Sequence, residues 1–445
     1  MTGQQLAESI TRRIRESGGE AFFVGGCVRD LLLGRIPKDF DVATSLPPER
    51  LQSLFPGAGL VGAHFGVVLV SQGGVSVEVA TYRSDGNYVD GRRPETVQFE
   101  TDARQDALRR DFTVNALFLD PFTGKIEDFT GGQADLQARL IRAIGNPRSR
   151  FEEDHLRLLR AVRFAAVLDF EIEPATLDAI TQMAPLVANV APERIRDEIS
   201  RILTGAHPRR GFELLHATGL LRQILPEVEA LRGVEQPPQF HPEGDVWTHT
   251  MLMLDSLCEP SLTLALGVLF HDIGKPGTFR IADRIRFDGH VELGMKIAAE
   301  ALHRLRYPGQ IVEQAVALVE NHMKFAAVTR MRESTLKRFL RMPRFEEHLE
   351  LHRADCLSSH RQLDHYEFAK QRLQDLPQEA LRPAPLITGR DLLAQGWQPG
   401  PAMGAVLREI EDAQLEGTLT TAAEALDYAA QKLKSAQGAV RTIRS

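Results

Sequence analysis

The first third of the chain alternates short apolar runs with helical or glycine-rich segments. The runs AFFVGG, FGVVLV, VSVEVATY and VNALFL lie between residues 21 and 119, and their β-branched and aromatic content is typical of strands. The segment before them, MTGQQLAESITRRIRESGGE, has the pattern of an amphipathic helix. This alternation predicts an α/β head that ends near Gly145-Asn146-Pro147.

Helical periodicity dominates the rest of the chain. From Glu152 to about Leu225 apolar residues recur at helical spacing, as in the row Leu158, Ala161, Ala165 and Leu168. Proline-rich breaks follow at residues 233–238 (GVEQPP) and 382–385 (RPAP). We therefore predict a head at residues 1–145, a neck at 146–232, a His-rich helical domain at 233–380 and a helical tail at 381–445.

Composition narrows the class of protein. With 445 residues, 43% hydrophobic and 25% charged, the chain has globular usage and room for about three domains. Its longest apolar stretch, Leu262 to Phe270, is too short to cross a bilayer, so we expect a cytoplasmic protein. The three cysteines are far apart without CxxC spacing, which excludes a disulfide framework and a cysteine zinc knuckle.

The net charge of -7 argues against a protein that binds polyanions over its whole surface. A local basic stretch exists between residues 139 and 163, where seven arginines stand against three acids. Any contact with nucleic acid is therefore expected to be local.

The stretch GGCVRDLLLGRIPKDFDVAT, residues 25–44, combines groups suited to phosphoryl transfer. The paired glycines Gly25 and Gly26 let backbone N–H groups approach phosphate oxygens, and Arg29 adds a bidentate donor. Asp39 and Asp41, one residue apart on a predicted strand, would point to the same face and could hold two divalent metals. An isolated DxD is weak support, because such pairs usually lie on solvated turns.

Glu78 is a candidate third metal ligand. It lies in the middle of VSVEVATY between apolar neighbours, where an unpaired buried charge would be costly.

Asp154, Arg157 and Arg160 follow one row of the predicted neck helix. An aspartate accepts from an exocyclic amine and an arginine donates to a ring nitrogen, so the pair fits cytosine and adenine and rejects uracil and guanine. The alternative is an ordinary helical salt bridge.

The His-rich domain contains FHPEGDVWTHTMLML, LFHDIGKPGTF, FDGH, ENH and HRAD. Imidazoles and carboxylates without cysteine suit Mg, Mn, Ni or Fe better than a structural zinc. The candidate ligands are His249, His271, Asp272, His290, His322 and Asp355.

The block at residues 25–44, with TYRSDGNYVDGRRPETVQF, RRDFTVNAL and FEEDHLRLLRAVRFAAVLDF in the same order, resembles class II tRNA nucleotidyltransferases and bacterial poly(A) polymerases. The resemblance covers residues 20–230. It implies an α+β fold with a polymerase-beta-like head (a mixed sheet with helices), followed by a helical neck, an HD-type helical domain and a helical tail.

The family resemblance also implies roles for individual residues. Asp39 and Asp41 would be catalytic and hold Mg²⁺, with Glu78 as a further ligand. The nucleotide would be bound by Gly25, Gly26, Arg29, Arg110, Asp111, Asp154, Arg157, Arg160 and Arg163. Among these, the carboxylate of Asp111 would accept from the ribose 2′-hydroxyl. The implied substrates are CTP, ATP and a tRNA 3′ end, with no membrane and no obligatory protein partner.

The His-rich array resembles HD-type metal-dependent phosphohydrolases. By this resemblance His249, His271, Asp272 and Asp355 hold one divalent metal, and His290 and His322 serve a second metal or a phosphate. The implied activity is that of a phosphatase or 2′,3′-cyclic phosphodiesterase. A domain kept only for structure or tRNA docking is the alternative.

Three other functions stay open: an A-adding enzyme, a poly(A) polymerase, and a phosphohydrolase with a degenerate RNA-binding head. An enzyme that adds only CC is expected to lack a flexible-loop segment, and SDGNYVDGRRP, residues 84–94, is present.

Overall fold

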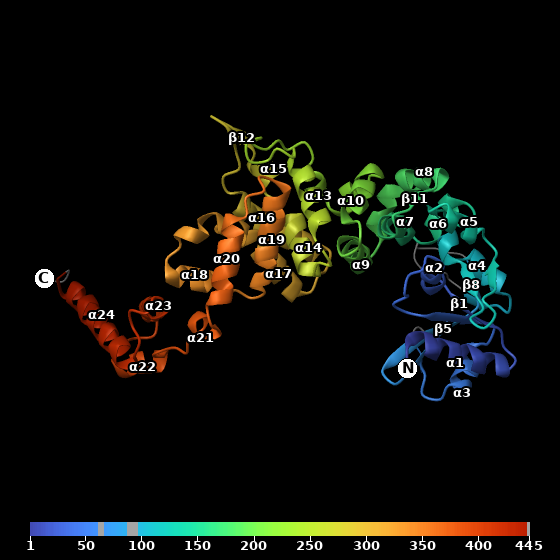
Figure 1. Ribbon diagram of the computed structural model, residues 1–445, viewed down its shortest axis with the longest axis horizontal. Coiled ribbons are helices and arrows are strands. Elements are labelled where there is room, and N and C mark those ends of the chain that lie inside the picture. The colour runs from blue at the N-terminus through green and yellow to red at the C-terminus, as the bar shows by residue number, and fades with distance from the viewer. Residues whose placement is uncertain (61–65, 87–96, 443–445) are drawn as a thin grey trace. The chain divides into compact units, whose positions relative to one another are not determined.

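The computed structural model describes the chain except for residues 61–65, 87–96 and 443–445 (Figure 1). The described residues form two compact units. Unit 1 comprises residues 1–233, 257–265 and 299–309, and unit 2 comprises residues 234–256, 266–298 and 310–445. The division into head, neck, His-rich domain and tail stays a prediction. No helix in the described ranges is long and apolar enough to cross a bilayer.

A seven-stranded mixed sheet lies in unit 1, which confirms the predicted mixed-sheet head. Its order is β3-β4-β5-β2-β1-β8-β9, with β2 and β5 parallel and the other neighbours antiparallel. The strands are β1 (Ala21–Val24), β2 (Asp41–Thr44), β3 (Gly59–Leu60), β4 (Val67–Gln72), β5 (Val75–Thr81), β8 (Leu117–Leu119) and β9 (Ile126–Asp128). Two short pairs join β6 (Arg83–Asp85) to β7 (Val97–Phe99) and β10 (Leu140–Ile141) to β11 (Glu171–Ile172).

Helices cover both faces of this sheet, with α1 and α3 below it and α2 above it in the view of Figure 1. The head helices are α1 (Gly3–Glu16), α2 (Gly26–Leu32), α3 (Pro48–Leu54), α4 (Ala103–Leu108), η2 (Thr113–Asn115) and α5 (Gly132–Gln137). Leu6, Ile10 and Ile14 are spaced four apart on α1 and are buried, so they form the apolar stripe by which this helix packs on the sheet.

The neck of unit 1 is helical, as predicted. Its helices are α6 (Pro147–Glu153), α7 (Leu156–Leu168), α8 (Pro174–Met183), η3 (Ala184–Asn189), α9 (Pro192–Leu203), α10 (Pro208–Ala217), α11 (Leu221–Ile224) and α12 (Pro226–Glu229). The continuous helix expected through Asp154 is wrong. Asp154 is extended between α6 and α7, and its Oδ1 accepts from the Leu156 N–H at 3.1 Å. This local hydrogen bond from a backbone N–H to an aspartate two residues earlier is an alternative to continuous helical backbone, and it lies where α6 ends and α7 begins.

Unit 2 is almost entirely helical, although the beginning of α14, the end of α16 and the first residue of α17 belong to unit 1. Its elements are α13 (Val246–Ser256), α14 (Leu262–Phe270), α15 (Lys275–Thr278), β12 (Arg280–Ile281), β13 (Ile285–Arg286), α16 (His290–Arg304), α17 (Gly309–Asn321), η4 (His322–Arg330), α18 (Glu333–Leu340), α19 (Phe345–Ser358), α20 (Asp364–Asp375), α21 (Gln378–Leu381), α22 (Gly389–Ala394), α23 (Pro401–Leu415) and α24 (Ala422–Thr442). One apolar core surrounds Phe325 and Phe339, and another surrounds Leu392 and Trp397.

A buried ion pair links the two longest neck helices, α7 and α9. The side chains of Arg163 and Glu198 are 10% and 3% exposed, and their charged groups are hydrogen-bonded to each other. Removing one partner of such a pair leaves an uncompensated buried charge.

Glu198→Ala is therefore expected to lower the free energy of unfolding of unit 1 by about 3–5 kcal/mol. The matched control is Glu193→Ala on the same helix, because Glu193 pairs with Arg306 where both side chains are exposed. This control is expected to cost less than about 1 kcal/mol. Urea unfolding of the two variants measures both values, and equal losses would contradict a structural role for the buried pair.

Candidate active site

One cavity of about 920 Å³ in unit 1 gathers almost all the residues predicted from the head and neck. It is lined by Gly25, Gly26, Arg29, Asp39, Asp41, Arg110, Asp111, Asp154, Arg157, Arg160 and Arg163. These residues come from the β1–α2 turn and α2, the start of β2 and the bend before it, the segment before η2, and α7 with the residue that precedes it by two. Segments more than 100 residues apart in sequence therefore meet around one space.

Asp39 and Asp41 stand at the edge of this cavity, although only one of them is on a strand. Asp41 begins β2, whereas Asp39 lies in the preceding bend, so the predicted strand starts two residues later than expected. Burial, with the charges of Glu78 and Asp39, raises the pKa of Asp41 to about 6, and the cation of Arg110 opposes the shift. Carboxylates crowded in this way suit a divalent cation.

Glu78 lies on β5 directly opposite Asp41 in the parallel register, so both side chains project from the same face of the sheet. It does not line the cavity, and its side chain is exposed. The prediction that Glu78 is buried at a cost in free energy is therefore wrong. Its neighbours Val77 and Val79 face the core instead.

Gly25 has a conformation that favours glycine. Its φ is +73°, and a Cβ there would lie 3.4 Å from Arg110 Nη1 and 3.8 Å from Asp41 Oδ2. The backbone of the paired glycines thus passes beside both the arginine and the carboxylate.

Arginines in the cavity are held by acids and amides. Arg29 Nη1 donates to Asn115 Oδ1 at 2.7 Å, and Asn115 Nδ2 donates to Asp111 Oδ1 at 3.2 Å. Arg160 binds Asp111 Oδ2 through Nε at 2.8 Å and Nη2 at 2.6 Å. Burial alone would raise the pKa of Asp111, but the guanidinium of Arg160 holds it at about 2, so the carboxylate is ionised.

Arg110 is oriented from α4. Asp106, whose side chain is 1% exposed, accepts from Arg110 Nη2 at 2.9 Å and from Arg109 Nη2 at 2.6 Å. The paired arginines therefore share one buried counter-ion, which directs Arg110 toward the cavity that it lines.

The Asp154–Arg157 salt bridge considered from the sequence is absent among the described contacts. Arg194 on α9 binds Asp154 with two parallel hydrogen bonds, Nη1 to Oδ1 at 3.0 Å and Nη2 to Oδ2 at 2.7 Å. Arg157 is instead bound by Glu153 and by the carbonyl oxygens of Arg150 at 2.9 Å and Arg109 at 3.2 Å. Asp154 and Arg157 thus line the same cavity with separate supports.

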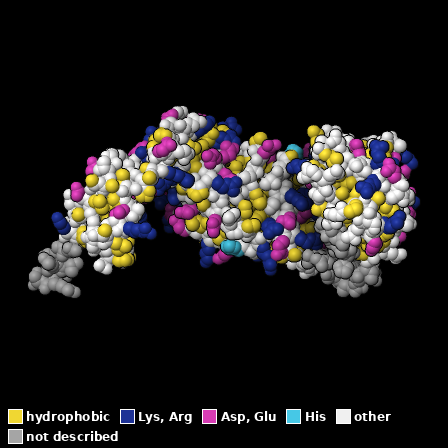
Figure 2. Space-filling model, turned by 90° about the horizontal axis from the view of Figure 1, so that it is seen from below, with side chains coloured by type: hydrophobic (Ala, Val, Ile, Leu, Met, Phe, Trp, Pro, Cys, Tyr) yellow, Lys and Arg dark blue, Asp and Glu magenta, His cyan; other side chains and the backbone are white. Residues whose placement is uncertain are grey.

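The pairing of acids and bases extends to the surface. On the face drawn in Figure 2, Lys and Arg side chains are interspersed with Asp and Glu side chains. Within the basic stretch at residues 139–163, Arg139 pairs with Asp169, and Arg142 pairs with Asp135 and Glu173.

A second group of predicted residues converges in unit 2. The ligand atoms of His249, His271 and Asp272 lie within 4.8 Å of one another, and so do those of Asp272, His290 and His322. Asp355 completes the cluster, with Oδ1 at 3.3 Å from His249 Nε2. All six residues predicted from the HD pattern therefore meet, with Asp272 common to both groups.

Charge and burial in this cluster fit a cation. Burial would lower the pKa of His249, but Asp355 and Glu243 beside it raise the pKa to about 9, so a metal bound at its Nε2 would displace a proton. Burial lowers the pKa of His322 to about 4, which keeps this imidazole neutral and able to ligate. His249 Nε2 and His271 Nε2 are buried without a hydrogen-bond partner in the described structure. Neutral imidazoles and carboxylates are suitable ligands for a divalent transition metal.

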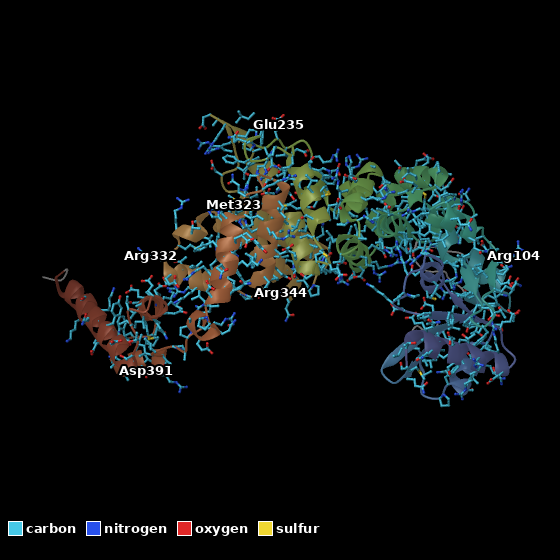
Figure 3. The ribbon with its side chains drawn as sticks, in the orientation of Figure 1. Arg104, Glu235, Met323, Arg332, Arg344 and Asp391 are labelled. Carbon is cyan, nitrogen blue, oxygen red and sulfur yellow. The ribbon has the colours of Figure 1, made fainter. Side chains whose placement is uncertain are left out.

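The cluster opens into a cavity of about 830 Å³. His290, His322, Asp355 and Lys275 line it, whereas His249, His271 and Asp272 lie beneath. Lys275 Nζ lies 2.6 Å from Asp272 Oδ2 and donates to Gln236 Oε1 at 2.6 Å. Met323, labelled in Figure 3, also lines this cavity and is half exposed.

Some supporting residues were not identified from the sequence. Asn115 lies inside the quoted motif RRDFTVNAL and Glu243 inside HPEGDVWTHTMLML, so both could have been found. Arg194 lies 40 residues from Asp154 and carries no local signal. Most of the predicted loop SDGNYVDGRRP falls outside the described residues.

Family models match most of the chain in three segments. Residues 21–142 match the poly(A) polymerase head domain, residues 169–231 match a family described as an RNA- and SrmB-binding site of polymerase A, and residues 290–430 match the tRNA nucleotidyltransferase domain 2 family. The crystal structure of the Bacillus stearothermophilus CCA-adding enzyme in complex with CTP has a TM-score of 0.75 at 27% identity, covering 98% of this chain and 99% of that one. The Thermotoga maritima CCA-adding enzyme complexed with tRNA, at 19% identity and a TM-score of 0.59, covers 96% and 95% and indicates the fold alone.

Curated relatives carry the name CCA-adding enzyme. The Limosilactobacillus reuteri protein is 42% identical over 252 residues, which are 56% of this chain and 62% of that relative, so this match spans less than two thirds of the relative. The Levilactobacillus brevis protein is 32% identical over 429 residues, which are 95% of this chain and 96% of the relative. Since this second match runs over nearly the whole of both proteins, the chain belongs to the family of CCA-adding enzymes whose head is of the poly(A) polymerase type.

Proposed function

We propose that this protein adds CMP, CMP and AMP from CTP and ATP to the 3′ end of tRNA without a nucleic-acid template and releases pyrophosphate. The observation that carries the proposal is the convergence of four predicted carboxylates, five predicted arginines and the paired glycines on one cavity. Family membership supports the same activity. The relatives named above include proteins crystallised with CTP and with tRNA.

Asp39 and Asp41 would hold Mg²⁺, and Glu78, which lies opposite Asp41 on the neighbouring strand, would support them. When bound, the metal promotes attack by the terminal 3′-hydroxyl and neutralises the triphosphate. Arg110, held by Asp106, and the backbone of Gly25 and Gly26 would bind phosphate oxygens. Asp111 remains an ionised acceptor for a ribose hydroxyl.

Base selection would use the hydrogen-bonding atoms of Asp154 and Arg157 that the supporting contacts leave free. Asp154 Oδ1 accepts from both Arg194 and the Leu156 N–H, whereas Oδ2 accepts only from Arg194 among the described contacts and keeps a second lone-pair site for the exocyclic amine of C or A. Arg157 uses both Nη1 hydrogens and one Nη2 hydrogen on Glu153 and two carbonyls. Its Nε–H and second Nη2–H, for which the described structure provides no partner, would donate to the base.

Asp154→Ala and Arg157→Ala are expected to lose discrimination of C and A from U and G by about 5- to 150-fold each, because each polar contact is worth about 1–3 kcal/mol. Single-turnover incorporation of each nucleotide measures the ratio. Glu152→Ala is the matched control, since this exposed neighbour does not line the cavity. Unchanged C and A preference in both variants would overturn the base-selecting role.

A second proposal concerns the histidine cluster of unit 2: residues 233–380, most of which belong to unit 2, form an HD domain that holds a divalent metal and hydrolyses phosphate esters, including 2′,3′-cyclic phosphates. His249, His271, Asp272 and Asp355 would hold the metal, and His290 and His322 would hold a second metal or the phosphate. The assignment is supported by the buried Nε2 atoms of His249 and His271, which make no hydrogen bond although the carboxylates of Asp355 and Asp272 lie 3.3 Å and 3.1 Å from them.

Two variants separate the two chemistries. Asp41→Asn is expected to lower nucleotide incorporation by at least about 10³-fold while leaving hydrolysis of 2′,3′-cyclic AMP unchanged, because its ligand role is confined to the head. His271→Ala is expected to do the reverse in the presence of Mn²⁺ or Ni²⁺.

Incorporation that depends on His271 but not on Asp41 would instead favour a phosphohydrolase with a degenerate RNA-binding head. Metal binding by the parent protein without hydrolysis would assign unit 2 a structural or tRNA-docking role. The choice among CCA addition, A addition and poly(A) synthesis requires sizing of the extended RNA.

A further inference from the structure

The four histidines of the cluster in unit 2 are oriented in the same way. His271, His290 and His322 each direct Nδ1 at the backbone carbonyl three residues earlier, at 2.8 Å from Val268, 2.8 Å from Phe287 and 2.7 Å from Val319. A carbonyl only accepts, so each Nδ1 carries the hydrogen and leaves Nε2 for the centre. His249 also directs Nδ1 away from the centre, but its acceptor is Glu243 Oε1 at 2.7 Å.

The positions of His271 and His322 relative to their helices explain why backbone carbonyls serve these two rings. His271 follows the last residue of α14 and His322 follows the last residue of α17. The final four carbonyls of a helix have no partner within the helix, so they are available to accept from these imidazoles.

His249 lies instead in the first turns of α13, where backbone carbonyls are engaged by the residues that follow. The carbonyl three residues before it, that of Val246, already accepts from Thr250 Oγ1 at 2.8 Å. An acceptor for His249 must therefore come from outside the helix.

The loop before α13 supplies this acceptor. Glu243 has a side chain that is 7% exposed, and its Oε1 accepts from His241 Nδ1 at 2.9 Å as well as from His249. Gly244, with φ of +129°, makes the turn between Glu243 and the helix. The side chain of Asp245 then accepts from the Thr248 N–H at 2.8 Å, so the loop is fixed on both sides of that glycine.

We propose that Glu243 is a positioning residue of the divalent-metal site: its carboxylate fixes the Nδ1–H tautomer of His249 and directs Nε2 toward His271 and Asp272. The inference rests on the metal site proposed for unit 2. Carboxylates behind a ligating imidazole orient the ring and make it a stronger ligand, and their loss typically weakens metal affinity 10- to 100-fold.

The test is calorimetric titration of Ni²⁺, an ion that imidazole ligands suit, into the full chain after removal of metals with EDTA. All proteins carry Asp41→Asn so that the head does not contribute to binding. Glu243→Ala is expected to weaken Ni²⁺ binding about 10- to 100-fold. Glu243→Gln keeps an oxygen that can accept from His249, and it is expected to lose less than about tenfold.

The matched control is Glu235→Gln, which removes one charge from an exposed position in the same segment between α12 and α13 (Figure 3). Its Ni²⁺ affinity is expected to equal that of the parent. Melting temperatures measured in EDTA distinguish a positioning role from a folding role. A positioning role predicts that Glu243→Ala weakens Ni²⁺ binding while the melting temperature of the metal-free protein stays close to that of the parent.

Ni²⁺ affinity in Glu243→Ala equal to that of the control would overturn the inference while leaving the metal site intact. Equal losses in the Ala and Gln variants, with matching falls in metal-free melting temperature, would also overturn it in favour of a folding role. If the parent binds no Ni²⁺, or if its Ni²⁺ binding survives His271→Ala, the proposed metal site is wrong and the inference fails with it.

Discussion

The arginines of the nucleotide cavity can be held close together only because each is bound to carboxylates, amides or backbone carbonyls. Arg160 is bound to Asp111, Arg163 to Glu198, and Arg110 to Asp106. An unpaired guanidinium in such surroundings would carry a desolvation penalty of several kcal/mol. The compensated arrangement fixes the side chains before a nucleotide arrives, so little ordering remains to oppose binding.

Supporting hydrogen bonds also fix the imidazole side chains of the second cluster. Each ring is fixed from behind by an acceptor, which leaves the inward nitrogens in one tautomer. Free carbonyls serve two of these rings after helix C-termini, and a loop carboxylate serves His249 near a helix N-terminus. The position of His249 within α13 thus explains why a side chain must support this ring, whereas His290 at the start of α16 uses the carbonyl of Phe287.

The sequence predicted the parts of the fold and site that depend on local patterns. Strand-like runs and helical periodicity gave the mixed-sheet head and the helical body, and recognisable motifs gave the residues of both clusters. Two local errors had physical causes. Asp154 is extended and accepts from the Leu156 N–H, which interrupts the expected helix, and Glu78 lies on the exposed face of β5. Supports such as Arg194 could not be predicted, because its pairing with Asp154 depends on how α9 packs beside α7.

The central claim is the ordered addition of C, C and A, and sizing of extended tRNA at nucleotide resolution tests it most directly. Three transcripts are needed, ending at the discriminator base, at C and at CC, each incubated with Mg²⁺ and with CTP, ATP or both. The account predicts that CTP extends the first transcript by two residues and that ATP then adds one residue and stops. Acceptance of A by the CC-ended transcript alone, or unlimited A addition to any RNA, would contradict it.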